Sequence, residues 1–231
     1  MQSDIFPWFF GAAVVAVIVA MIVGQIQARK RTEALQATAE EMGFTFEGED
    51  WSDQSQSPQL ATVLFDRGGG GQFKNIMTGA SAGFKTSLFD YSFTVGSGKN
   101  SHTYTQTVVA FSQELWLPLF EMRPEGFLDR VTDAIVHKDI DFESHSEFSR
   151  RYLLRGPEQE KIRELFTPAL LTFLEGMPPE DKWHVEGGGA TLILYHSDVT
   201  VGAEQIRAFL DETSSVARTF FSCCGMKNLA P

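Results

Sequence analysis

The polar stretch at residues 137–147 holds the residue types that could do chemistry. It reads HKDIDFESHSE, and in an extended conformation Asp139, Asp141, Glu143 and His145 would point to one face of a strand. Carboxylates and an imidazole are ligand types that divalent metals use in proteins. The candidate metal ligands are therefore Asp139, Asp141 and His145, and a metal-dependent hydrolase centred on this stretch is one function to weigh.

The spacing within this stretch matches no specific metal-binding motif. An EF-hand loop needs glycine at its sixth position and a bidentate glutamate at its twelfth, where this chain has Ser144 and Arg150. Alternate side chains on a strand are also roughly 6.6 Å apart, so further ligands would have to come from elsewhere. We expect the stretch to be exposed or paired with the three arginines that follow it, with Ile140 and Phe142 buried beneath.

Two glycine-rich segments have little resemblance to ligand-binding loops. A phosphate-binding loop needs the pattern G-x-x-x-x-G-K-[ST], but the lysine that follows Gly68–Gly71 is flanked by Phe73 and Asn75. We interpret Gly68–Gly71 as a turn and Gly187–Gly189 as the turn of a hairpin. Because no motif in the sequence implies a cofactor, we predict none.

The apolar segment at residues 5–27 has the length of a membrane-spanning helix. Its run from Ile5 to Ile26 has no ionisable residue and spans about 33 Å as a helix, whereas a bilayer's hydrocarbon core is about 30 Å thick. A cleaved signal peptide would have a basic start and a shorter apolar run, and this chain starts MQSD. We predict a retained helix that contacts the lipid bilayer through residues 5–27, preceded by an outside tail at 1–4.

Charges beside this segment predict its orientation. Asp4 is the only charged side chain before it, and Arg29, Lys30 and Arg31 follow it. Because basic residues stay on the cytoplasmic side, we predict a single-pass cell-membrane protein with its N-terminus outside and its C-terminal domain in the cytoplasm. The net charge is −11, and it is −13 without Asp4 and the three basic residues. Such a domain is repelled by nucleic acid, so we expect no nucleic-acid partner.

Small residues recur at every fourth position of the apolar segment. Ala12, Ala16, Ala20 and Gly24 would form a ridge that lets two membrane helices approach closely. These are the candidate helix-packing residues, and the second helix would come from a membrane-protein partner or from a homodimer. The alternative is an anchor that is simply rich in alanine.

The remaining chain predicts an α+β fold, in which antiparallel strands are packed against helices. We expect residues 28–43 to continue the membrane helix as a stalk, 44–224 to form one domain, and 225–231 to be a tail. Alternating aromatic residues predict a strand at Phe84–Val95. Other expected elements are a strand at Asp139–Phe142 and helices at Glu125–Val136, Ala169–Glu175 with Thr167 as its N-cap, and Ala203–Phe221.

Four motifs in the second half of the chain carry a resemblance to other proteins. They are LPLFEMRPE at Leu117–Glu125, DIDF at Asp139–Phe142, FSRRY at Phe148–Tyr152 and LRGP at Leu154–Pro157. Together with the N-terminal span, they resemble a group of bacterial single-pass membrane proteins that has no assigned activity. The resemblance runs from about Leu64 to Leu210; it implies a bacterial inner-membrane setting and assigns no functional residue.

Three functions are therefore open. The favoured one is a membrane-tethered cytoplasmic interaction or scaffold module without a catalytic site. The alternatives are the metal-dependent hydrolase and an envelope assembly subunit whose helix ridge contacts another membrane helix. Geometry discriminates between them, because a hydrolase requires Asp139, Asp141 and His145 to converge in a cleft.

Overall fold

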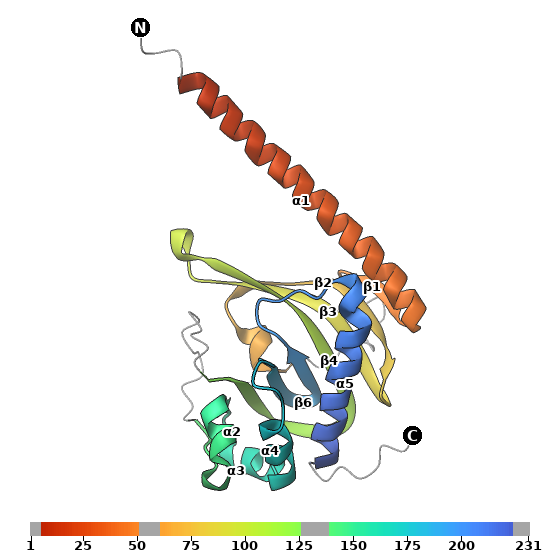
Figure 1. Cartoon of the computed structure of the whole chain (residues 1–231), viewed down its shortest axis with the longest axis vertical. Coiled ribbons are helices and arrows are strands. Elements are labelled where there is room, and N and C mark those ends of the chain that lie inside the picture. The colour runs from red at the N-terminus through yellow and green to blue at the C-terminus, as the bar shows by residue number, and fades with distance from the viewer. Residues whose placement is uncertain (1–5, 51–60, 126–138, 224–231) are drawn as a thin grey trace.

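The structure, a computed structural model, describes residues 6–50, 61–125 and 139–223 of the chain. A long N-terminal helix leads into a domain in which an antiparallel sheet is packed against helices (Figure 1). The α+β prediction is therefore confirmed. The helix predicted at Glu125–Val136 lies outside the described residues, except for its first residue.

Helix α1, Phe6–Met42, runs without interruption for 37 residues. From Ala13 to Lys30 every side chain is exposed, and this part of the helix is long and apolar enough to cross a membrane. Nearer its C-terminal end, Leu35 and Ala39 are buried in the core of the domain. The same helix therefore contains the candidate membrane span and a segment that packs as part of the domain.

The described residues form one sheet of six strands, all paired antiparallel. The strands are β1 (Thr45–Gly48), β2 (Gly69–Ser81), β3 (Phe84–Val95), β4 (His102–Pro124), β5 (Tyr152–Arg155) and β6 (His184–Tyr195). Their order is β1-β2-β3-β4-β5, and β6 also pairs with β4. Strand β3 has the predicted bounds. The 23-residue β4 pairs with β3 along its first half, with β5 at its end and with β6 along its middle.

Helices connect and cover these strands. They are α2 (Ser146–Arg151), α3 (Gln159–Leu165), α4 (Pro168–Glu175) and α5 (Ile206–Cys223), with short 3₁₀ turns η2 (Val63–Asp66), η3 (Gly98–Asn100), η4 (Glu143–His145) and η5 (Ala203–Gln205). The N–H of Leu170 donates to Oγ1 of Thr167 at 3.3 Å, which confirms Thr167 as the N-cap of α4. Helix α5 corresponds to the helix expected at Ala203–Phe221, but it begins at Ile206, after η5, and ends at Cys223.

The sheet has a hydrophobic cluster on each face, because neighbouring residues of a strand point to opposite sides. The larger one, here called the main core, contains Phe111, Phe120 and Phe220 and lies between the sheet and helices α4 and α5. The smaller one, here called the second cluster, contains Phe89 and Val108 and packs against η2. Both faces of the central strands are therefore covered.

Gly187–Gly189 lies in the middle of β6, so the predicted hairpin turn is wrong. Gly187 pairs with Phe120 and Gly189 with Leu117 of β4. A Cβ atom on Gly187 would collide with the ring of Phe120, and one on Gly188 would collide with the carbonyl oxygen of Ala61. Glycine occurs here because other parts of the chain approach the strand closely and leave no room for a side chain. Residues Gly69–Gly71 likewise belong to strand β2 rather than to a turn.

Candidate functional site

The predicted strand at Asp139–Phe142 is not a strand, although it lies beside β5. The N–H of Ile140 donates to the carbonyl of Leu154 at 2.8 Å. The N–H of Leu154 in turn donates to Oδ1 of Asp139 at 3.0 Å. The strand is not formed because this side chain accepts the hydrogen bond that a backbone carbonyl would accept in a regular ladder.

The candidate metal ligands do not converge. Asp139 is bound to the backbone of β5, and the side chain of Asp141 is exposed. His145 lies in η4, with its Nδ1 3.1 Å from Oε2 of Glu175 on α4. Among the described residues, no group of three or more His, Cys, Asp or Glu side chains could hold a metal ion. The geometry therefore does not favour the metal-dependent hydrolase.

Glu175 instead joins α4 to both η4 and α2. Its Oε1 accepts the N–H of Phe148 at 3.1 Å, in addition to the contact with His145. Burial acts to raise the pKa of Glu175, but the hydrogen bonds from His145 and Phe148 outweigh it and lower that pKa. His145 thus has a structural partner within the domain.

The arginines after the acidic stretch also have structural roles. Arg150 pairs with Glu147 on the surface of α2. Arg151 donates to the carbonyl oxygens of Glu175 at 2.8 Å and Met177 at 2.9 Å, so it binds the C-terminal end of α4. Beneath the stretch, Ile140 is buried as predicted. Phe142 is only partly buried, because it packs at the edge of the main core.

A buried group of charged side chains, which we call the ionic cluster, lies on the opposite face of the sheet from the main core. It consists of Arg67 after η2, Glu121 and Arg123 of β4, and His184 and Glu186 of β6. Arg67 is paired with Glu121, and its Nη2 lies 3.7 Å from Oε1 of Glu186. The Nε of Arg123 lies 3.2 Å from Oε1 of Glu121.

Strand register explains why the ionic cluster forms. Glu121 and Glu186 are directly opposite each other in the β4–β6 pair, where two carboxylates would repel without a compensating charge. Arg67 and Arg123 supply that charge from two directions. The cluster was not predicted from the sequence. The available signal was the charged pairs Glu121/Arg123 and His184/Glu186, each at alternate positions of an otherwise apolar strand.

Glu186 is the most enclosed member of the ionic cluster, with a side chain that is 0% exposed. Its Oε1 accepts the hydroxyl of Tyr195 at 2.6 Å, and its Oε2 accepts the N–H of Leu64 at 2.7 Å. Burial raises the pKa of Glu186 to about 7, and the Arg67 charge opposes the rise. Burial also lowers the pKa of His184 well below its usual value.

The ionic cluster therefore holds η2 against the sheet. Leu64 and Arg67 both lie in or next to η2, and both bind carboxylates of the sheet. Because Glu186 is closed to solvent, it cannot meet a substrate in this conformation. What the cluster can do is hold a proton or a charge inside the fold.

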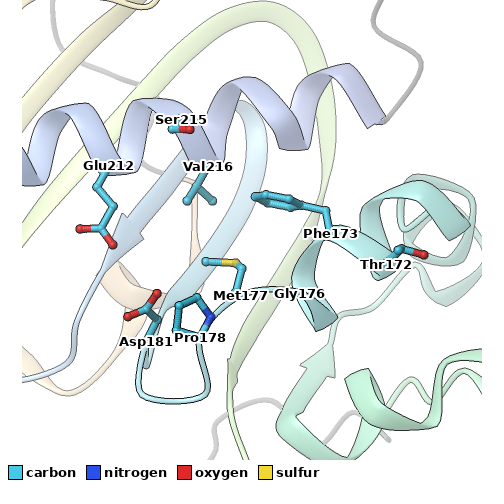
Figure 2. Close-up of a pocket in the computed structure, with 9 residues that line it drawn as sticks. All are labelled: Thr172, Phe173, Gly176, Met177, Pro178, Asp181, Glu212, Ser215 and Val216. Carbon is cyan, nitrogen blue, oxygen red and sulfur yellow. The ribbon is translucent and has the colours of Figure 1, made fainter.

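An open groove of about 410 Å³ lies between α4, α5 and the loop that follows α4 (Figure 2). Phe173, Met177 and Val216 give it an apolar lining, and the carboxylates of Asp181 and Glu212 lie together at one end. Partial burial, followed by the Asp181 charge, raises the pKa of Glu212. Such a groove can accept an apolar side chain that has a cation next to it.

The base of α1 is held by a polar network, which we call the helix seat. Arg31 pairs with Asp90 of β3 and donates to the carbonyl of Val201 at 2.8 Å. Asp90 also accepts hydrogen bonds from Asn75 at 2.7 Å and Thr107 at 2.8 Å. Of the three basic residues beyond the apolar segment, one therefore binds the domain, whereas Arg29 and Lys30 stay exposed.

Comparison with known proteins gives a likeness of fold. No protein-family model matches the chain, and no curated protein matches it. The crystal structure of the mycobacterial trehalose monomycolate transport factor A, TtfA, matches with a TM-score of 0.54 and 15% sequence identity. The match covers 88% of this chain and 99% of that chain. At this identity the likeness concerns the fold alone.

Proposed function

We propose that this protein is a membrane-tethered interaction module that presents its domain to a partner protein in the same membrane. The observation that carries the proposal is the continuity of α1. One helix passes from an exposed apolar segment into the main core at Leu35 and Ala39, and Arg31 fixes it to Asp90 of the sheet. No flexible linker separates the candidate span from the domain, so the domain is presented to a partner in one orientation.

The orientation that we propose places the N-terminus outside and the domain in the cytoplasm of a single-pass cell-membrane protein. Arg29 and Lys30 support it, since both are exposed at the end of the apolar segment and basic residues favour the cytoplasmic side. A cysteine at the exposed position 161, in a chain without Cys223 and Cys224, should react with a membrane-impermeant reagent only after lysis. Reaction in intact cells would reverse the orientation.

The partner that we propose is a membrane protein of an envelope transport or assembly system. TtfA, which has a similar fold, is described as a transport factor, and this analogy supports the class of partner. The groove between α4 and α5 is the surface that we assign to it. Because Asp181 and Glu212 lie at one end of an apolar lining, the matching ligand is an apolar side chain of the partner next to lysine or arginine.

A site-specific photo-crosslinker at the exposed groove residue Ser215 tests this function in the full-length chain in native membranes. We expect a discrete adduct with one membrane protein. Glu212→Lys should reduce its yield about tenfold or more, because it places a cation against the cation of the partner. Asp211→Lys is the matched control, since it makes the same charge change on the same helix outside the groove, and it should leave the yield unchanged. Equal yields for the two variants would contradict the proposal.

A further inference from the structure

We propose that the tip of the β3–β4 hairpin rests on the lipid headgroup layer, so that the protein contacts the bilayer at two separate points. This inference builds on the proposed membrane span, but it concerns a surface that the partner groove does not involve. The tip is defined here as residues 96–101, which include η3. The bound surface would be that of anionic phospholipids.

The helix seat determines where the bilayer lies relative to the domain. Because α1 is continuous and is held at Arg31, Leu35 and Ala39, its exposed segment leaves the domain in a fixed direction. The exposed segment ends at Arg29 and Lys30, which are the side chains expected at the headgroup level. The membrane surface therefore passes close to the point where α1 enters the domain.

The hairpin reaches toward the same surface. Figure 1 shows that the ends of β3 and β4 extend away from the rest of the sheet, on the side toward which the N-terminal half of α1 points. No other part of the described domain extends as far in that direction (Figure 1). A bilayer that contains the exposed segment of α1 therefore meets this tip before it meets the rest of the domain.

The chemistry of the tip suits a headgroup layer. Its residues are Gly96, Ser97, Gly98, Lys99, Asn100 and Ser101, and all are exposed. Lys99 is the one charged side chain of the tip. The chain without Asp4, Arg29, Lys30 and Arg31 has a net charge of −13. The carboxylate of Asp198 is 3.3 Å from Nε2 of His102, the residue that follows the tip. Among the described residues, no ion pair involves Lys99.

Charge then selects which part of the domain approaches the membrane. The acidic remainder is repelled by anionic lipid, whereas lysine near the surface is attracted to it. Lys99 at the tip and the Arg29–Lys30 pair at the end of the apolar segment are cationic points at two ends of one rigid unit. Contact at both points would fix the tilt of α1 as well as the height of the domain.

The test uses the full-length protein, without Cys223 and Cys224, in vesicles of phosphatidylcholine and phosphatidylglycerol in equal parts. A fluorophore on Asn100→Cys reports contact through quenching by a lipid with a spin label on its headgroup. The same fluorophore on Lys161→Cys, an exposed site on α3, is the matched control. A fluorophore on Val17→Cys, with an acyl-chain quencher, reports insertion of α1.

We expect strong quenching at position 100 and none above background at position 161. Lys99→Glu should reduce the quenching at position 100 about fivefold or more, and added salt should act in the same direction. Equal quenching at positions 100 and 161, with position 17 still quenched, would overturn the hairpin contact alone and leave the tip as a surface for a protein partner. Loss of quenching at position 17 would overturn the membrane span and this inference together.

Discussion

The acidic stretch at residues 137–147 and the ionic cluster contain similar side chains in opposite environments. In the stretch, Asp141 is exposed and Asp139 serves the backbone of β5. In the cluster, Arg67, Glu121 and Glu186 are 8%, 6% and 0% exposed and lie far apart in the sequence. Side chains that are close in the sequence therefore do not converge when their segment is irregular. Strand pairing, in contrast, brings together side chains that are distant in the sequence.

This difference has an energetic consequence. Removing one partner from a buried ionic network leaves a charge without compensation, which costs about 3–5 kcal/mol. Exposed pairs contribute about 0–1 kcal/mol, because water screens both charges. Substitutions in the two regions should therefore differ in their effects on stability far more than the residue types suggest.

The largest effect is expected for Arg67→Ala. It removes the cation that lies against both Glu121 and Glu186, so the free energy of unfolding should fall by about 3–5 kcal/mol. Denaturant unfolding of the full-length protein in detergent measures this loss. Arg150→Ala is the control, since it breaks the exposed pair with Glu147 and should cost at most about 1 kcal/mol. Similar losses for the two variants would remove the distinction between the regions.

An intermediate and pH-dependent effect is expected for Glu186→Gln. The pKa of Glu186 is about 7 in the folded protein against 4.5 ordinarily, so between these values the folded state holds a proton that the unfolded state releases. Glu186 therefore destabilises the fold increasingly as pH rises from 4.5 to 7, by about 1–3 kcal/mol.

Unfolding of wild type and Glu186→Gln across this pH range tests the prediction. The difference in stability between the two should shift in favour of the variant as pH rises. The wild type and the variant must be compared because His184 also makes stability depend on pH. Burial lowers the pKa of His184, so His184 destabilises the folded protein as pH falls, whereas Glu186 does so as pH rises. Glu147→Gln, at an exposed position, is the control. A difference that is constant with pH would mean that Glu186 is ionised throughout the range.

The smallest effect is expected for Asp141→Ala, which should change the free energy of unfolding by no more than about 0.5 kcal/mol. Its carboxylate is exposed and its neighbour Asp139 makes the backbone contact. Asp139→Ala should cost about 1 kcal/mol, because it removes the acceptor for the N–H of Leu154. A stoichiometric divalent metal in the purified protein, lost in Asp141→Ala, would restore the hydrolase hypothesis.

Patterns within single stretches of the sequence correctly predicted some of the helices and strands. The apolar run and the helix formers after it predicted α1, alternating aromatic residues predicted β3, and Thr167 with Pro168 predicted the start of α4. Helical and strand periods are set by the backbone itself, so side-chain order reveals them directly. For the same reason the α+β class could be predicted without knowledge of the contacts.

Contacts between segments could not be predicted in this way. Gly187 has no side chain because Phe120 of another strand occupies that space, and Arg31 binds Asp90 rather than lipid because β3 passes beneath it. Glu186 becomes a buried group with a raised pKa only because β4, β6 and the segment after η2 meet there. The sequence thus determined the apolar helix and those elements, such as β3 and α4, that have a clear local pattern. The tertiary structure decided the partners of the charged residues, because burial and neighbouring charges depend on segments that are distant along the chain.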